Sequence, residues 1–158
     1  MEVSMGNGSS TSDLATLEGI RRRRAELRES MSALELALAG PAPSDDVRWA
    51  ERVHVALVEL SADFREHIAV TEGPEGLYAE VVAAAPRLSE AVARLTGEHR
   101  QIARLVDDLL ARVSTPETGH VDRVRRLGTM LLGLLVRHRQ RGSDLVYEAY
   151  EFDVGGET

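Results

Sequence analysis

Four long stretches of the sequence repeat their apolar residues at alternating gaps of three and four positions. This spacing keeps one stripe of a helix turned toward a core. Connections that contain glycine and proline separate the stretches, at residues 40–43, 73–76 and 115–119,. The pattern predicts four helices, over residues 12–39, 45–72, 86–114 and 119–152, and a short extra helical piece over 77–84. Because short connections join long helices, we expect an all-α, antiparallel, up-down-up-down four-helix bundle.

The 158 residues fit a single domain,. Residues 1–11 are rich in glycine and serine and have no hydrophobic period, which predicts a disordered tail,. We assign the bundle to residues 12–152 and a C-terminal tail to residues 153–158. With 43% hydrophobic but only 4% aromatic residues, the composition favours an aliphatic helical core over a sheet, which would be richer in aromatic and β-branched residues,.

Charge and cysteine content exclude several kinds of function. A formal net charge of −7 repels phosphate backbones, so we expect no nucleic-acid partner,. The absence of cysteine excludes disulfides, thiolate catalysis and cysteine-bound metal,. No apolar run reaches the roughly 20 residues of a membrane span, and no signal-peptide pattern precedes the domain,. We therefore expect a cytoplasmic protein without a membrane partner, in an oligomeric state that the sequence does not indicate.

Polar residues interrupt the apolar stripes at one depth of the predicted bundle. They are Arg24, His67 followed by Thr71, His99, and His138 followed by Gly142. Burial of a polar group without a partner costs a few kcal/mol, so side chains of this kind need one another. Counted along antiparallel helices, the arginine and the three histidines should meet in one layer. The remaining histidines, His54 and His120, fall outside the stripes, and we expect both at the surface.

Three short motifs carry a resemblance to a known family. They are Phe64-Arg65-Glu66-His67, Glu98-His99 followed by Ile102 and Leu105, and the segment 138–145. Residues 12–152 resemble the hemerythrin-like family, or HHE cation-binding domain, whose helices bring histidines and carboxylates together around two iron ions. The resemblance implies a four-helix bundle with metal in its core and a small-molecule or dioxygen-type ligand.

The expected ligand set is incomplete in this sequence. Arg24 stands where the family has its first-helix histidine, and Thr71 stands where it has its second-helix glutamate. Gly142 and Ser143 occupy the positions that usually carry the fourth-helix carboxylate. Two neighbouring metal ions need bridging groups that offset their charge. We therefore do not expect an intact di-iron centre with reversible oxygen binding, and the site is better described as degenerate.

One interpretation of these residues is a modified metal site. His67, His99 and His138 would hold one iron or zinc ion, with Glu72 as a fourth ligand if the helix unwinds at Gly73. Three neutral imidazoles with an open position suit iron-dependent binding, sensing or redox chemistry. The sequence does not decide whether the protein is an enzyme, and it identifies no catalytic residue.

A second interpretation is a metal-free bundle. Arg24, Thr71 and Gly142 would line a polar pocket beside the histidines, where a small anionic or oxygenated ligand or a partner binds. Glycine on a packed stripe removes side-chain volume, which favours a cavity. A third interpretation is haem ligation by one or two of the histidines, which the bundle permits but no feature favours.

Overall fold

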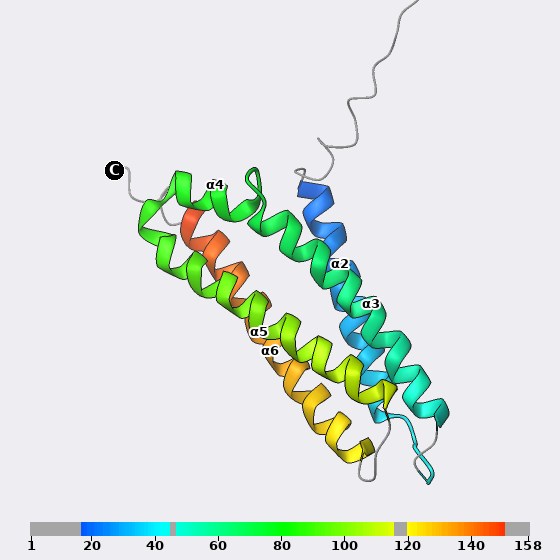
Figure 1. Ribbon diagram of the computed structural model, residues 1–158. Helices are drawn as coiled ribbons and strands as arrows, with labels where there is room; N and C mark the ends of the chain where they lie inside the picture. The colour runs from blue at the N-terminus through cyan, green and yellow to red at the C-terminus, as the bar shows by residue number, and fades with distance from the viewer. Residues whose placement is uncertain (1–16, 45–46, 116–119, 151–158) are drawn as a thin grey trace, which may run out of the picture.

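The computed structural model describes residues 17–44, 47–115 and 120–150. Four long helices lie side by side in Figure 1: α2 (Leu17–Ala39), α3 (Val47–Glu72), α5 (Ser89–Ser114) and α6 (His120–Tyr150). The short helix α4 (Leu77–Ala84) and one 3₁₀ turn, η2 (Pro86–Leu88), connect α3 to α5. The described residues contain no strand. The prediction of an all-helical fold with four long helices and a short additional piece over 77–84 is confirmed.

Each long helix packs against two others. α2 packs against α3 and α6, and α5 packs against the same two helices, so the four enclose a common interior. In Figure 1, α4 crosses one end of this bundle, beside the end of α6. The helix α4 therefore closes the end of the bundle at which α3 stops.

Aliphatic side chains fill most of the interior, as the stripes predict. Leu34, Leu60, Leu109 and Leu131, one from each long helix, have no exposed surface. Close packing of branched aliphatic side chains around such positions removes apolar surface from water, which is the main favourable contribution to folding. The fold thus derives its stability from the same three-four pattern that predicts its helices.

A smaller apolar cluster lies at the α4 end of the bundle. It consists of Tyr78, Val81, Ala85, Leu88, Leu95, Leu145 and Ala149. Pro86 is the first residue of the connecting 3₁₀ turn. Its missing N–H costs nothing there, because the N–H at a helix start has no partner within the helix. Along α5, His99 lies between Leu95 of this cluster and Ile102 of the main core, so the polar layer separates two apolar regions.

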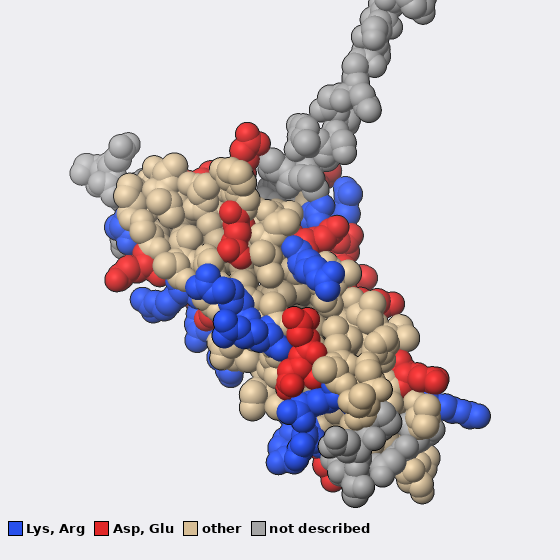
Figure 2. Space-filling view, in the orientation of Figure 1, with Lys and Arg blue, Asp and Glu red and all other residues tan. Residues whose placement is uncertain are grey.

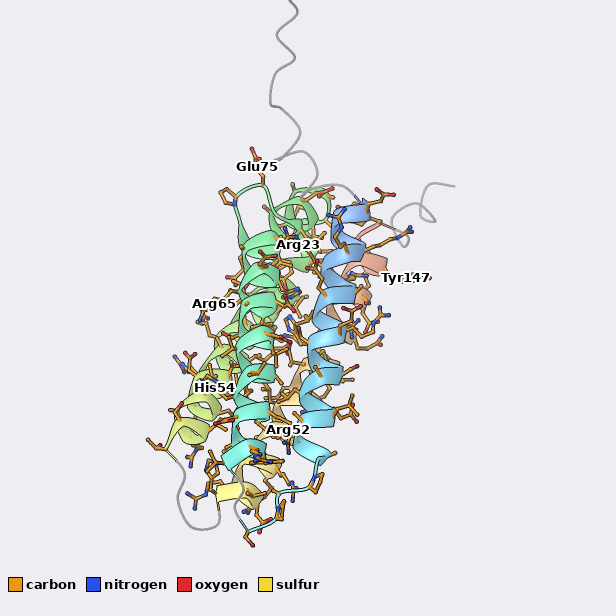
Figure 3. The ribbon with its side chains drawn as sticks, turned by 90° about the vertical axis from the view of Figure 1, so that its right-hand side faces the viewer. Arg23, Arg52, His54, Arg65, Glu75 and Tyr147 are labelled. Carbon is orange, nitrogen blue, oxygen red and sulfur yellow. The ribbon has the colours of Figure 1, made fainter. Side chains whose placement is uncertain are left out.

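The outer histidines differ from one another. His54 is exposed on α3, as expected, and lies with Arg65 on the outer side of that helix in Figure 3. His120, expected at the surface, is instead only 7% exposed. The first turn of α6 packs against α3, where the His120 ring meets the edge of Trp49 at a centroid distance of 6.4 Å. That contact between helix ends is not visible in the periodicity of either helix.

Some sequence-based predictions fall outside the described residues. They concern the tails 1–11 and 153–158, the start of the first predicted helix at residues 12–16, the start of the second at residues 45–46, and the ends of the fourth at residues 119 and 151–152. On the face in Figure 2, basic and acidic side chains lie interspersed on the surface. In the described part of the chain, no helix combines the length and apolar character needed to cross a bilayer.

Candidate metal centre

Three histidine rings converge in the interior, each from a different helix. His67 lies on α3, His99 on α5 and His138 on α6. Nε2 of His138 lies 3.0 Å from Nε2 of His99 and 3.2 Å from Nε2 of His67. The rings of His99 and His138 are 1% and 2% exposed, and that of His67 is partly buried. The structure thus brings together the three histidines that the stripes single out, with one nitrogen of each within 4.8 Å of the others.

Carboxylates bind the opposite side of two of these rings. Glu72 Oε2 lies 2.7 Å from Nδ1 of His99. Glu98 Oε1 lies 2.9 Å from Nδ1 of His138, and its other oxygen pairs with Arg141. A carboxylate only accepts hydrogen bonds, so the proton of each ring lies on Nδ1. The Nε2 atoms of His99 and His138 therefore both carry lone pairs, although they lie only 3.0 Å apart.

Glu72 does not take the position of a fourth ligand. Helix α3 remains regular as far as Glu72, so this side chain projects about 100° away from Thr71,. It reaches the outer nitrogen of His99 instead of the point where the Nε2 atoms converge. In this structure Glu72 is thus a hydrogen-bond partner of His99 and lies outside the converging group of three histidines.

Glu98 belongs to the candidate site through a contact that the sequence does not indicate. As the neighbour of His99 on α5 it points about 100° away from that ring. Its side chain is only 19% exposed and contacts His138 on α6. The partner of Glu98 is thus the histidine of the adjacent helix, and periodicity along α5 alone carries no signal for that contact.

Aromatic rings fix the orientation of the histidines. Phe64 stacks on His67 with a centroid distance of 5.7 Å and meets the His99 and His138 rings edge-on. Tyr78 of α4 stacks on His99 with a centroid distance of 5.6 Å, and its hydroxyl lies 3.3 Å from Nε2 of that ring. Burial raises the pKa of Tyr78, so the phenol is neutral. Sequence reasoning missed Tyr78 because it lies outside the four long stripes.

Burial keeps the three imidazoles unprotonated. It lowers the pKa of His67 to about 3, and the neighbouring histidines and Arg24 act in the same direction. It also lowers the pKa of His99 to about 3 and lowers that of His138, for which the bond to Glu98 acts in the opposite direction. Neutral imidazole is the form that binds metal ions. At neutral pH the cluster is therefore ready to accept a cation other than a proton.

A cavity of about 240 Å³ adjoins the cluster. Its lining includes His67 and His138 together with side chains from α2, α3, α4 and α6: Arg23, Arg24, Leu27, Arg28, Val70, Thr71, Leu77, Tyr78, Arg139, Gly142 and Ser143. Thr71 is buried, and its hydroxyl donates to the carbonyl of His67 at 2.8 Å. A Cβ atom added at Gly142 would meet nothing within 4 Å, in agreement with the open space predicted there.

Arg24 lies at the edge of this layer. We expected it inside the core with the histidines, but its side chain is exposed while also lining the cavity. An arginine has a long flexible stem, which lets the guanidinium stay in water even when the Cα faces inward. The buried layer therefore contains three histidines, and the arginine lies at its rim.

The donor set fits one metal ion and does not fit two. In the described segments, only one group of ligand atoms lies close enough together to hold a metal ion. It consists of the three imidazoles. A dinuclear centre needs bridging ligands between its ions, and no carboxylate of the described residues belongs to the converging group. Compared with family models, curated proteins and solved structures, the chain has no match. Its site is therefore interpreted from geometry and charge.

Proposed function

We propose that this chain is a hemerythrin-like, up-down-up-down four-helix bundle that binds one divalent metal ion, iron or zinc, through His67, His99 and His138. The bound ion serves to bind or sense a small-molecule ligand that enters from the adjoining cavity. The observation that carries the proposal is the 3.0 Å contact between Nε2 of His99 and Nε2 of His138.

This contact has no proton to form a hydrogen bond. The carboxylates of Glu72 and Glu98 hold the ring protons on the Nδ1 atoms,. The Tyr78 hydroxyl can donate to Nε2 of His99, but it supplies no proton to Nε2 of His138. Two lone-pair nitrogens at this distance repel each other unless a cation lies between them. Nitrogen ligands of a tetrahedral zinc ion lie about 3.3 Å apart, given zinc–nitrogen bonds of about 2.0–2.1 Å. Nε2 of His138 lies at similar distances from the other two rings, 3.0 Å from Nε2 of His99 and 3.2 Å from Nε2 of His67.

The carboxylates behind two of the rings also suit a divalent ion. Three neutral imidazoles contribute no charge, whereas Glu72 and Glu98 each place a carboxylate one hydrogen bond away, that of Glu98 being shared with Arg141. Carboxylates in this position orient a histidine and make its free nitrogen a stronger ligand. Imidazole ligands suit iron and zinc. A second ion would add charge that no described carboxylate nearby offsets.

Three protein ligands leave coordination positions open. In catalytic and sensing metal sites such positions accept a ligand from solution. The cavity that reaches His67 and His138 provides the space for one. When bound, the ion would supply a Lewis-acidic centre, while Phe64 and Tyr78 hold the rings in place and keep the interior apolar,.

Metal analysis of the full-length protein, produced without a histidine tag in iron- and zinc-supplemented medium, tests the proposal. We expect roughly one ion per chain, as three-histidine sites hold. The His99→Ala variant should lose this ion, and the His54→Ala variant should retain it because His54 is exposed on the outer side of α3. Circular dichroism verifies that both variants fold. Protein that stays free of metal, or a His99→Ala variant that still holds it, would contradict the proposal.

A further inference from the structure

Three arginines of the cavity have no acidic partner among the described residues. Arg24 and Arg28 extend from α2 and Arg139 extends from α6, and all three line the cavity that reaches the histidines. Arg23 lines it too, but it forms an ion pair with Glu66 and lies between α2 and α3 in Figure 3. Within residues 17–44, 47–115 and 120–150, no carboxylate pairs with any of the other three guanidiniums.

The three unpaired guanidiniums lie near one another. Arg24 and Arg28 are close enough to Arg139 to act on it electrostatically, although they belong to a different helix. Like charges in a partly buried site repel each other. An anion placed among them would remove this repulsion and would accept charge-assisted hydrogen bonds, which guanidinium groups make with planar oxyanions.

The remainder of the lining defines the size and character of the ligand. The volume of about 240 Å³ exceeds that of a single water molecule severalfold, so it accommodates a small organic molecule,. Leu27, Val70 and Leu77 give the cavity apolar walls, and the hydroxyls of Thr71 and Ser143 add polar contacts. A molecule with a charged end and a short apolar body matches these walls.

We propose that the cavity binds a small organic oxyanion, a carboxylate or a phosphate, whose charged group is held by Arg24, Arg28 and Arg139. Its other end extends toward His67 and His138. Only this second contact rests on the proposed function, because it places the ligand beside the metal ion. The arginine contact stands on the cavity and its charges alone.

Isothermal titration calorimetry on the full chain tests this inference at low ionic strength. The probes are sodium glutarate, sodium phosphate and neutral glutaramide, each added to chelator-treated and to zinc-treated protein. We expect glutarate to bind both preparations, to bind the zinc-treated one more tightly, and to bind more weakly as salt is added. Glutaramide should not bind. Tighter binding of phosphate than of glutarate would identify phosphate as the source of the oxyanion.

Matched arginine variants locate the contact. Arg28→Gln should weaken oxyanion binding about tenfold, the loss expected for a charge-assisted hydrogen bond. Arg22→Gln should leave it unchanged, because Arg22 is an exposed neighbour on α2 that does not line the cavity. Equal effects of the two variants, or no oxyanion binding to either preparation, would overturn the inference even if metal is present. Oxyanion binding by a protein that never holds metal would support the inference and refute only the metal proposal.

Discussion

Lowering the pH of the metal-free protein should destabilise it through the buried histidines. In the unfolded chain each imidazole takes up a proton below its ordinary pKa of 6.5. In the folded chain, burial lowers the pKa of His67 and of His99 to about 3, so both stay neutral over the intervening range. The unfolded state then binds more protons than the folded state. Stability is therefore complete above pH 6.5 and is lost as the pH falls from 6.5 toward 3.

The magnitude follows from the two pKa values. Each histidine reduces the free energy of unfolding by about 1.4 kcal/mol for every pH unit below 6.5. At pH 5.5 the two histidines together cost about 3 kcal/mol relative to pH 8. His138, whose pKa is also lowered, adds to this loss. A loss of this size is a large fraction of the roughly 5–15 kcal/mol that stabilises an ordinary domain.

Urea unfolding followed by far-UV circular dichroism measures this effect. The titrations are run between pH 8 and pH 5 in the presence of a chelator, and the slope of unfolding free energy against pH counts the protons. The His99→Gln variant should lose about one proton from this slope. The His54→Gln variant should keep the whole slope, because the His54 ring is exposed in the folded state as well. A wild-type slope near zero, or equal slopes in the two variants, would refute this reasoning.

Two further predictions concern single side chains. Glu98→Gln should weaken zinc binding about 10–100-fold, as loss of a carboxylate behind a histidine ligand does,. Glu90→Gln, an exposed position on the same helix, should leave zinc binding unchanged. Competition with a chromophoric chelator measures the zinc affinity of both variants. Gly128→Ala should be less stable than Gly142→Ala by about 1–3 kcal/mol in urea unfolding. The reason is that a Cβ at Gly128 would lie 2.5 Å from Cδ1 of buried Leu38, whereas one at Gly142 meets open space; equal stability would contradict it.

Periodicity predicts the helices of this protein well because one physical constraint produces both the repeat in the sequence and the buried face of each helix. A helix that faces a core must repeat its buried positions every three or four residues, and the inward members of α5 from Leu95 to Val113 do so,. The connection from α3 to α5 is also predictable, because glycine and proline delimit the short helix. His120 illustrates the limit. It is buried and contacts Trp49 across the interface between two helix ends, and neither helix encodes that contact in its own period.

The candidate site is predictable to the same degree. The histidines interrupt apolar stripes, so His99 and His138 can be found from their own helices. The contacts of Glu72 and Glu98 depend on the rotation of one helix against another, which a single stripe does not specify. The position of Tyr78 depends on how α4 crosses the bundle end. The sequence therefore predicts which histidine rings converge but not which groups orient them.

Orientation matters because protons and metal ions compete for the same nitrogens. Burial makes protonation of His67 and His99 unfavourable until the pH reaches about 3, yet the same burial would also disfavour a bare metal ion,. The carboxylates of Glu72 and Glu98 distinguish the two cations. They hold the ring protons of His99 and His138 on the outer nitrogens, so that the inner Nε2 atoms of these two rings carry lone pairs beside Nε2 of His67. A proton can be shared by only two of those nitrogens, whereas a divalent ion binds all three at once. In the proposed site, neutral pH therefore favours the metal ion over the proton.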